Sequence, residues 1–291
     1  MKPSTPAGAV TKDFEAGERL IANKDYAGAM KSFKKAAEHG HALAQNYMGL
    51  IYAKGLGVTQ DFQKAEPWFR LSAEQGEALA QNNLGLMYAK GEGVTQSYQQ
   101  SEFWLLKAAE QGNSEAQYNL GFMYAKGQGV KQDDEKAVHW FRKSAEQGDD
   151  VAQYNLAFMY EKGIGVPQDY QQAVFLYSMA AGQGNADAQL NLGGLYDTGE
   201  GVDQDQKQAV TWWNKAAEKG HPVAQNNLGL MYAQGHGVTQ DYIEAYKWFS
   251  LASDAGDESA KNGLKIAESL MTASQITEAK ELVNDWKQSH K

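Results

Sequence analysis

The 291-residue sequence contains no cysteine, so disulfides, thiolate nucleophiles and cysteine-based metal sites are excluded together. It also has no apolar run near the roughly 20 residues that cross a bilayer. The opening residues, MKPSTPAGAV, lack the hydrophobic core of a secretory signal. We therefore expect no direct membrane insertion and a cytoplasmic location as the sequence stands. The alternative is a periplasmic or secreted location, if a leader has been removed.

Positive charge is scarce as well. Lys and Arg number 27 against 36 Asp and Glu, which gives a net charge of −9. Nucleic acids and anionic membranes are bound by surfaces rich in Lys and Arg. We therefore expect no nucleic-acid partner, although the 42% of hydrophobic residues suffices for a folded core.

Glycine, in contrast, is abundant and regularly placed. The stretch QNNLGLMYAKGEGVTQ, starting at Gln81, recurs 144 residues later with two changes. Seven glycines mark the period, each 36 residues after the one before: Gly40, Gly76, Gly112, Gly148, Gly184, Gly220 and Gly256. A fixed period of this size indicates stacked structural repeats, and six full repeats lie between the first and last of these glycines.

Each repeat carries the pattern of two helices. In the second repeat, Ala80, Leu84 and Met87 lie on one helical stripe, and Trp104 and Ala108 lie on another after an intervening loop. Two apolar stripes separated by a glycine-containing loop predict an antiparallel helix pair. We interpret the tryptophan, which recurs in five of the six repeats, as part of the core between repeats.

The loop between the two helices has the form G-x-G-V, as at Gly91, Gly93 and Val94. Its first glycine suits a helix end that requires a positive φ, and its valine can pack back under the turn. Polar residues such as Asp61 and Asn113 precede the following helices and suit their N-caps.

The two ends depart from the pattern. Residues 11–39 keep the spacing of an ordinary tetratricopeptide helix pair but lack the G-x-G-V loop. A solenoid needs polar ends for solubility. The predicted organisation is a disordered segment over 1–10, the tetratricopeptide-like pair over 11–39, six repeats over 40–255 and a capping helix pair over 256–291.

The recurring columns A-Q-x-N-L-G-x-M-Y-x-x-G-x-G-V-x-Q-D and A-x-x-W-[FY]-x-x-A-A-x-x-G resemble the Sel1-like repeat (SLR), a longer-looped relative of the tetratricopeptide repeat. The resemblance covers residues 40–255 and implies an all-α fold. That fold is a right-handed α-solenoid, a superhelix of stacked antiparallel helix pairs. Local departures are Leu176 in place of the tryptophan, Ala157 in place of the first-helix glycine, and the pair Gly193-Gly194.

Fragments that imitate catalytic motifs lack their partners. Asp197 opens a D-T-G sequence, but aspartic proteases need two such loops on a β-scaffold. Ser32 opens S-x-x-K without the S-D-N and K-T-G motifs of penicillin-recognising enzymes. The six histidines show no metal-ligand spacing. We predict no catalytic residue, no cofactor and no metal site.

The resemblance implies a non-enzymatic scaffold or adaptor that binds a protein or peptide on its concave face, and we expect a monomer. It places two positions of each first helix on that face, the residue after the fixed glutamine and the residue four further on. Alternatives are a β-lactamase-like hydrolase of the repeat family and a passive structural spacer.

Side chains at these positions are candidates for partner contact where they differ between repeats. Tyr118, Phe122, Tyr154 and Phe158 would offer an aromatic cluster of the kind that dominates binding energy, or else would pack against the neighbouring helix. The candidate partner-binding residues are Asn82, Tyr118, Phe122, Tyr154, Phe158, Leu190, Lys90, Lys126 and Lys162.

The lysines belong to a column at the ends of first helices. They complement the negative end of the helix dipole or, alternatively, bind acidic groups of a partner. A fixed asparagine, found for example at Asn83 and Asn119, repeats too uniformly to select a partner, so we interpret it as a structural hydrogen bonder.

Overall fold

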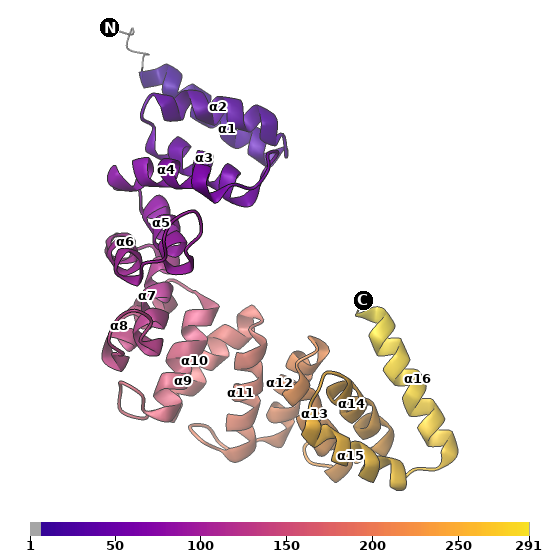
Figure 1. Ribbon diagram of the computed structural model, residues 1–291. Helices are drawn as coiled ribbons and strands as arrows, with labels where there is room; N and C mark the ends of the chain where they lie inside the picture. Colours follow the sequence, from indigo (N-terminus) through magenta and orange to yellow (C-terminus); the bar gives the residue numbers. More distant parts are fainter. Residues whose placement is uncertain (1–6, 291) are drawn as a thin grey trace, which may run out of the picture. The chain divides into compact units, whose positions relative to one another are not determined.

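The computed structural model describes residues 7–290, which form sixteen α-helices and, within that range, no strand (Figure 1). The helices are α1 (Ala7–Ala22), α2 (Tyr26–Glu38), α3 (Ala42–Lys54), α4 (Phe62–Glu74), α5 (Ala78–Lys90), α6 (Tyr98–Glu110), α7 (Ser114–Lys126), α8 (Asp134–Glu146), α9 (Asp150–Lys162), α10 (Tyr170–Gln183), α11 (Ala186–Thr198), α12 (Gln206–Glu218), α13 (Pro222–Gln234), α14 (Tyr242–Asp254), α15 (Glu258–Ser269) and α16 (Ala273–Ser289).

The chain divides into two compact units, an N-terminal unit up to Gln147 and a C-terminal unit from Gly148. Within each unit, consecutive helices up to α15 pack against each other, and each helix pair stacks on the following pair. The predicted all-α solenoid of stacked helix pairs is confirmed. No helix within residues 7–290 has the length and apolar character needed to cross a membrane.

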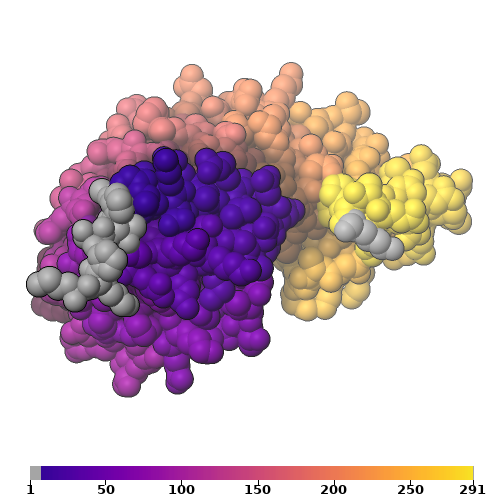
Figure 2. Space-filling model, turned by 90° about the horizontal axis from the view of Figure 1, so that it is seen from above, coloured from indigo at the N-terminus to yellow at the C-terminus, as the bar shows by residue number. Residues whose placement is uncertain are grey.

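The ends of the described chain are helical. Of the segment 1–10, which we expected to be disordered, residues 1–6 lie outside the described residues, whereas residues 7–10 belong to α1. At the other end, α16 packs against α14 and forms the edge of the C-terminal unit, yellow in Figure 2. The indole Nε1 of Trp286 on α16 donates a hydrogen bond to Glu218 Oε2 at 3.0 Å.

The loop chemistry predicted from the sequence is confirmed. Gly91 ends α5 in the left-handed conformation with φ 72°, and Val94 packs into the core formed around α4 and α5. Gly93 also has a positive φ, 71°, and lies against the start of α4. A Cβ on Gly93 would lie 2.5 Å from the carbonyl carbon of Phe62, so the loop docks on the preceding repeat only because glycine has no side chain.

The predicted caps and core are confirmed in the same way. Asp61 accepts a hydrogen bond from the Lys64 amide at the start of α4, and Asn113 accepts one from the Ala116 amide at the start of α7. Trp104 joins a core cluster that includes residues of the preceding repeat, as expected of a residue between repeats.

A relay of buried glutamine side chains joins successive repeats. Gln45 on α3 donates from Nε2 to the Ala37 carbonyl at the end of α2, 3.1 Å away. Its Oε1 accepts from Nε2 of Gln75, at the end of α4, at 2.6 Å. One side chain therefore ties three helices, and it gives the Ala37 carbonyl, which also accepts from the Gly40 amide, a second donor.

The relay recurs with nearly the same lengths. Gln81 donates to the Ala73 carbonyl at 3.1 Å and accepts from Gln111 at 2.7 Å. Gln183 donates to Oε1 of Gln153 at 2.9 Å. The register of the stack is thus fixed by hydrogen bonds to the backbone as well as by apolar contact.

The relay is incomplete in the last two repeats. Lys219 and Ala255 occupy the positions that correspond to Gln75. Among the described residues, Oε1 of Gln189 and Oε1 of Gln225 are buried without a hydrogen-bond partner. A buried acceptor without a partner costs about 1–3 kcal/mol, so these repeats lack stability that the earlier ones have.

We expect Gly93→Ala to destabilise the protein much more than Gly112→Ala. Both glycines have a positive φ, 71° and 90°, but nothing lies within 4 Å of a Cβ on Gly112. Gly112→Ala should cost about 1–2 kcal/mol for the left-handed backbone alone. Gly93→Ala adds the clash with Phe62 and should cost about 2–5 kcal/mol. Urea unfolding followed by circular dichroism measures both; equal losses would contradict the docking role of Gly93.

We expect Lys219→Gln to stabilise the protein by about 1 kcal/mol, because the new amide can donate to the unpaired Oε1 of Gln189. The same amide can reach the Gly184 carbonyl that the Lys219 ammonium now contacts, as Gln183 reaches the Gly148 carbonyl. A rise in the thermal midpoint checks this. Lys280→Gln on the exposed surface of α16 is the matched control and should leave the midpoint unchanged; a fall with Lys219→Gln would refute the relay argument.

Candidate partner-binding grooves

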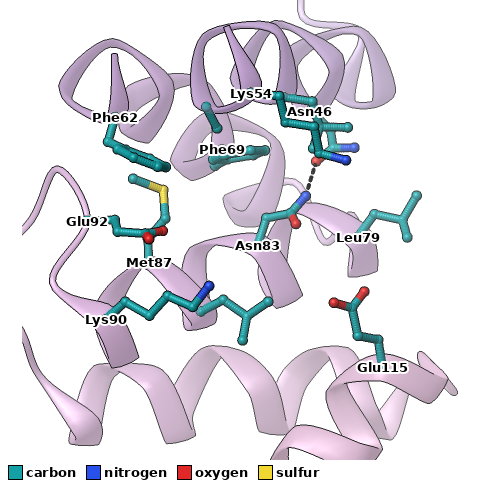
Figure 3. A pocket seen from close by; sticks show the side chains of 13 residues that line it. Asn46, Lys54, Phe62, Phe69, Leu79, Asn83, Met87, Lys90, Glu92 and Glu115 are labelled. Carbon is teal, nitrogen blue, oxygen red and sulfur yellow. Dashed lines mark hydrogen bonds between the residues drawn. The ribbon is translucent and has the colours of Figure 1, made fainter. Parts of the chain in front are cut away.

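A groove of about 500 Å³ runs along the first helices of the N-terminal unit (Figure 3). Helices α3, α5 and α7 each contribute side chains to it, because the repeat places equivalent positions on the same side of successive first helices. Leu50 and Leu86, at one of the two variable positions of the first helix, line it together with Asn46, which is only 1% exposed. Lys90, one of the candidate residues, lines it too.

The groove combines apolar walls with charges of both signs. Leu50, Leu86 and Met87 supply apolar surface, and Lys54 and Lys90 bring two ammonium groups from the last turns of α3 and α5. Two carboxylates also line it, Glu92 after α5 and Glu115 on α7, which points into the groove in Figure 3. The arrangement can hold a polypeptide segment through apolar contacts while the charges orient it.

Asparagine pairs bridge neighbouring first helices beside the groove. Nδ2 of Asn83 donates to Oδ1 of Asn46 at 3.0 Å (Figure 3), and Nδ2 of Asn119 donates to Oδ1 of Asn82 at 3.3 Å. The structural role predicted for the fixed asparagine is confirmed at these two positions. Asn83 nevertheless also lines the groove, which its uniform repetition in the sequence did not indicate.

The structure differs from the prediction at Asn82. We expected this side chain to contact a partner, but only 1% of it is exposed. It is buried against α7, where its Oδ1 accepts a hydrogen bond from Asn119 Nδ2. Asn82 therefore holds α5 against α7 and presents no surface of its own. The sequence pattern singled out this position, but contacts with the neighbouring helix decide how much of the side chain is accessible.

The aromatic candidates of the N-terminal unit are Tyr118 and Phe122 on α7, both half-buried. The Tyr118 ring centroid lies 5.8 Å from that of the core residue Phe141 on α8 and 6.4 Å from that of Phe122. The Lys126 ammonium lies 6.0 Å from the Phe122 ring centroid. Tyr118 therefore packs against the neighbouring helix, one of the two roles that the sequence left open.

The C-terminal unit repeats this arrangement with Tyr154 and Phe158 on α9. The Tyr154 ring centroid lies 5.8 Å from that of the buried Tyr177. Burial of the Tyr154 hydroxyl raises its pKa, and the negative charge of Asp187 raises it further. Phe158 is 38% exposed, with the Lys162 ammonium 5.9 Å from its ring centroid. In the C-terminal unit the tyrosine packs inward and the phenylalanine is exposed, whereas Tyr118 and Phe122 of the N-terminal unit are both half-buried.

Leu190, the remaining candidate, lines a second cavity of about 310 Å³ in the C-terminal unit. Its backbone carbonyl accepts a hydrogen bond from Nε1 of Trp213 at 3.0 Å. The cavity corresponds in position to part of the groove between α3 and α5, but its lining differs. Thr198 lies there at the position of Lys90, and Gly194 at the position of Leu86.

Comparison with known proteins agrees with this architecture. A model of the Sel1 repeat matches seven consecutive segments, residues 10–41, 42–77, 78–113, 114–149, 150–185, 186–221 and 222–257. The first of them overlaps the pair that the sequence likened to an ordinary tetratricopeptide repeat. A search of curated proteins found no significant match.

Two solved structures show extensive similarity. A Sel1 repeat protein from Oxalobacter formigenes is 36% identical, with a TM-score of 0.74, over 83% of this chain and 99% of that one. The protective antigen c5321 of uropathogenic Escherichia coli, which displays an SLR fold, is 30% identical, with a TM-score of 0.59, over 97% of this chain and 85% of that one. Since the repeat model accounts for most of the sequence, the chain belongs to the Sel1 repeat family.

Proposed function

We propose that this protein is a non-enzymatic adaptor that holds a segment of a partner protein in the groove formed by α3, α5 and α7. The observation that carries the proposal is the groove itself, where apolar side chains, amides and two ammonium groups face one space of about 500 Å³. Ligand sites commonly combine apolar walls with a few polar groups that fix orientation.

The family supports a binding role. Sel1 repeat proteins generally mediate protein–protein interactions on a scaffold that is generally not catalytic. The stacked helices provide a long surface whose side chains vary between repeats while the packing positions recur, which suits selective recognition.

The charges favour a partner segment that carries an acidic group. Lys54 and Lys90 balance the charges of Glu92 and Glu115 in the groove of a chain whose net charge is −9, so the groove is less negative than the protein as a whole. A carboxylate of the partner would pair with the ammonium groups, and a neighbouring apolar side chain of the partner would contact Leu50 and Leu86. Because exposed charges are screened by salt, this binding should weaken as ionic strength rises.

We expect the double variant Lys54→Glu plus Lys90→Glu to lose its partner while keeping its fold. Both lysines are exposed, so reversing their charge should leave the helical circular dichroism unchanged. Capture of lysate proteins on the immobilised protein, quantified by mass spectrometry, should show at least one protein reduced about tenfold or more.

The matched control is Lys107→Glu plus Lys143→Glu, which makes the same charge change at exposed positions of α6 and α8. That variant should retain the partner. If both double variants capture the same proteins as the unaltered chain, the groove is not the binding site and a passive spacer is favoured. Turnover of a chromogenic β-lactam that Ser32→Ala abolishes would instead favour the hydrolase.

The aromatic residues give a second test of where a partner lies. Phe122→Ala and Phe158→Ala each remove a partly exposed ring from the first helices of one unit. Each should weaken partner capture about tenfold or more, with little loss of stability, if the partner extends over that ring. Tyr118→Ala plus Tyr154→Ala removes rings that pack on Phe141 and Tyr177, so it should lower the thermal midpoint. Unchanged capture with either phenylalanine variant would show that its ring does not contact the partner.

A further inference from the structure

Gly194 lies in the interior of α11 without a structural reason to be glycine. It follows Gly193, where a Cβ would lie 2.6 Å from Cδ1 of Trp213, so Gly193 is required for the helices to approach. No atom lies within 4 Å of a Cβ on Gly194, and its backbone is helical. A glycine inside a helix costs about 1 kcal/mol relative to alanine, and here packing gives nothing in return.

The absence of a side chain at Gly194 leaves open space beside α11. The corresponding positions of the other repeats carry large side chains: Leu50, Leu86, Phe122, Phe158 and Leu230. At Gly194 the missing side chain leaves part of the cavity of about 310 Å³. Leu190 and Leu195 from α11 and Val223 from α13 form its apolar walls.

Two carboxylates line the same cavity, Glu161 at the end of α9 and Glu200 in the loop after α11. Glu161 is held in place, because its Oε2 accepts from the Tyr177 hydroxyl at 2.8 Å and its Oε1 accepts from the Lys162 ammonium at 2.5 Å. Glu200 accepts from the Thr198 hydroxyl at 3.2 Å. Two negative charges against one ammonium leave the lining with an excess of negative charge.

The side-chain amide of Asn227 also lines this cavity. Asn227 on α13 corresponds to Asn83, which donates to Oδ1 of Asn46 in the N-terminal unit. The residue that corresponds to Asn46 here is Leu190, whose side chain has no acceptor. The Asn227 side chain lines the cavity and has no hydrogen-bond partner within residues 7–290. Its amide is therefore available to a ligand.

We propose that this cavity binds a basic side chain, arginine or lysine, of a partner protein. Such side chains place an apolar stem against hydrophobic surface and keep the charged end for polar groups. The stem would contact Leu190, Leu195 and Val223, and the cationic end would donate hydrogen bonds to the carboxylates, with the Asn227 oxygen as a further acceptor. The proposal depends on the proposed adaptor function in one respect: it requires that a partner protein binds along the first helices.

The first experiment titrates the full-length, isotope-labelled protein with the short peptide acetyl-Ala-Arg-Ala-amide and follows the backbone amide resonances. Matched peptides carry Lys, Leu or Glu at the centre. The Arg and Lys peptides should shift the resonances of Gly194, Asn191 and Asn227, and the Leu and Glu peptides should bind about tenfold or more weakly. Equal binding of all four peptides would overturn the proposal.

The second experiment fills the cavity with Gly194→Leu. Because the position faces empty space and leucine favours a helix, this variant should have a higher thermal midpoint while losing the Arg peptide. Gly182→Leu on α10 is the matched control, since a Cβ there also meets nothing within 4 Å. It should keep the peptide affinity. Retained binding by Gly194→Leu, or a lowered midpoint, would refute the proposal.

A third variant separates charge from shape. Glu200→Gln keeps the size of the side chain and removes its charge, so the affinity for the Arg peptide should fall about fivefold or more and depend less on salt. Unchanged affinity would exclude Glu200 as a contact and contradict the proposed charge recognition. Failure of these tests leaves partner capture by the Lys54 and Lys90 groove unaffected, so the two proposals fail separately.

Discussion

The repeats are joined by a buried glutamine, and the rest of the structure depends on that constraint. Gln45 binds a backbone carbonyl of the preceding helix pair and a side chain from the end of its own pair. Because a buried amide requires partners at defined distances, the hydrogen bonds specify one register, whereas apolar contact alone tolerates sliding. The glutamine therefore recurs in all six repeats of residues 40–255, and its neighbours on the exposed side of the first helix are free to differ.

The proposed binding sites follow from that division of roles. The groove with Lys54 and Lys90 and the cavity with Gly194 occupy corresponding positions in different repeats. The groove carries two ammonium groups and two carboxylates, whereas the cavity is lined by two carboxylates and, among the described residues, by no Lys or Arg. The same arrangement of helices thus presents a different charge in different repeats. Since electrostatic complementarity gives specificity, each site would select a partner group by its charge.

Sequence reasoning reached some parts of the molecule and missed others. It identified the left-handed Gly91, the capping Asp61 and the bridging role of Asn83, because each follows from local backbone geometry or strict periodicity. It misjudged the accessibility of Asn82, which depends on a hydrogen bond from the following repeat. It treated Gly193 and Gly194 as a pair. Only Gly193 has to be glycine, because Trp213 of α12 packs against it.

The sequence by itself determined the all-α fold, the helix pairs and the faces they bury, because a 36-residue period with fixed glycines and apolar stripes permits little else. Only the tertiary structure decided which side chains on the first helices reach the surface. The partner that covers Asn82 comes from the next helix pair, and the space beside Gly194 is bounded by helices on either side of α11. Such accessibility depends on contacts between residues far apart along the chain, which local periodicity does not contain.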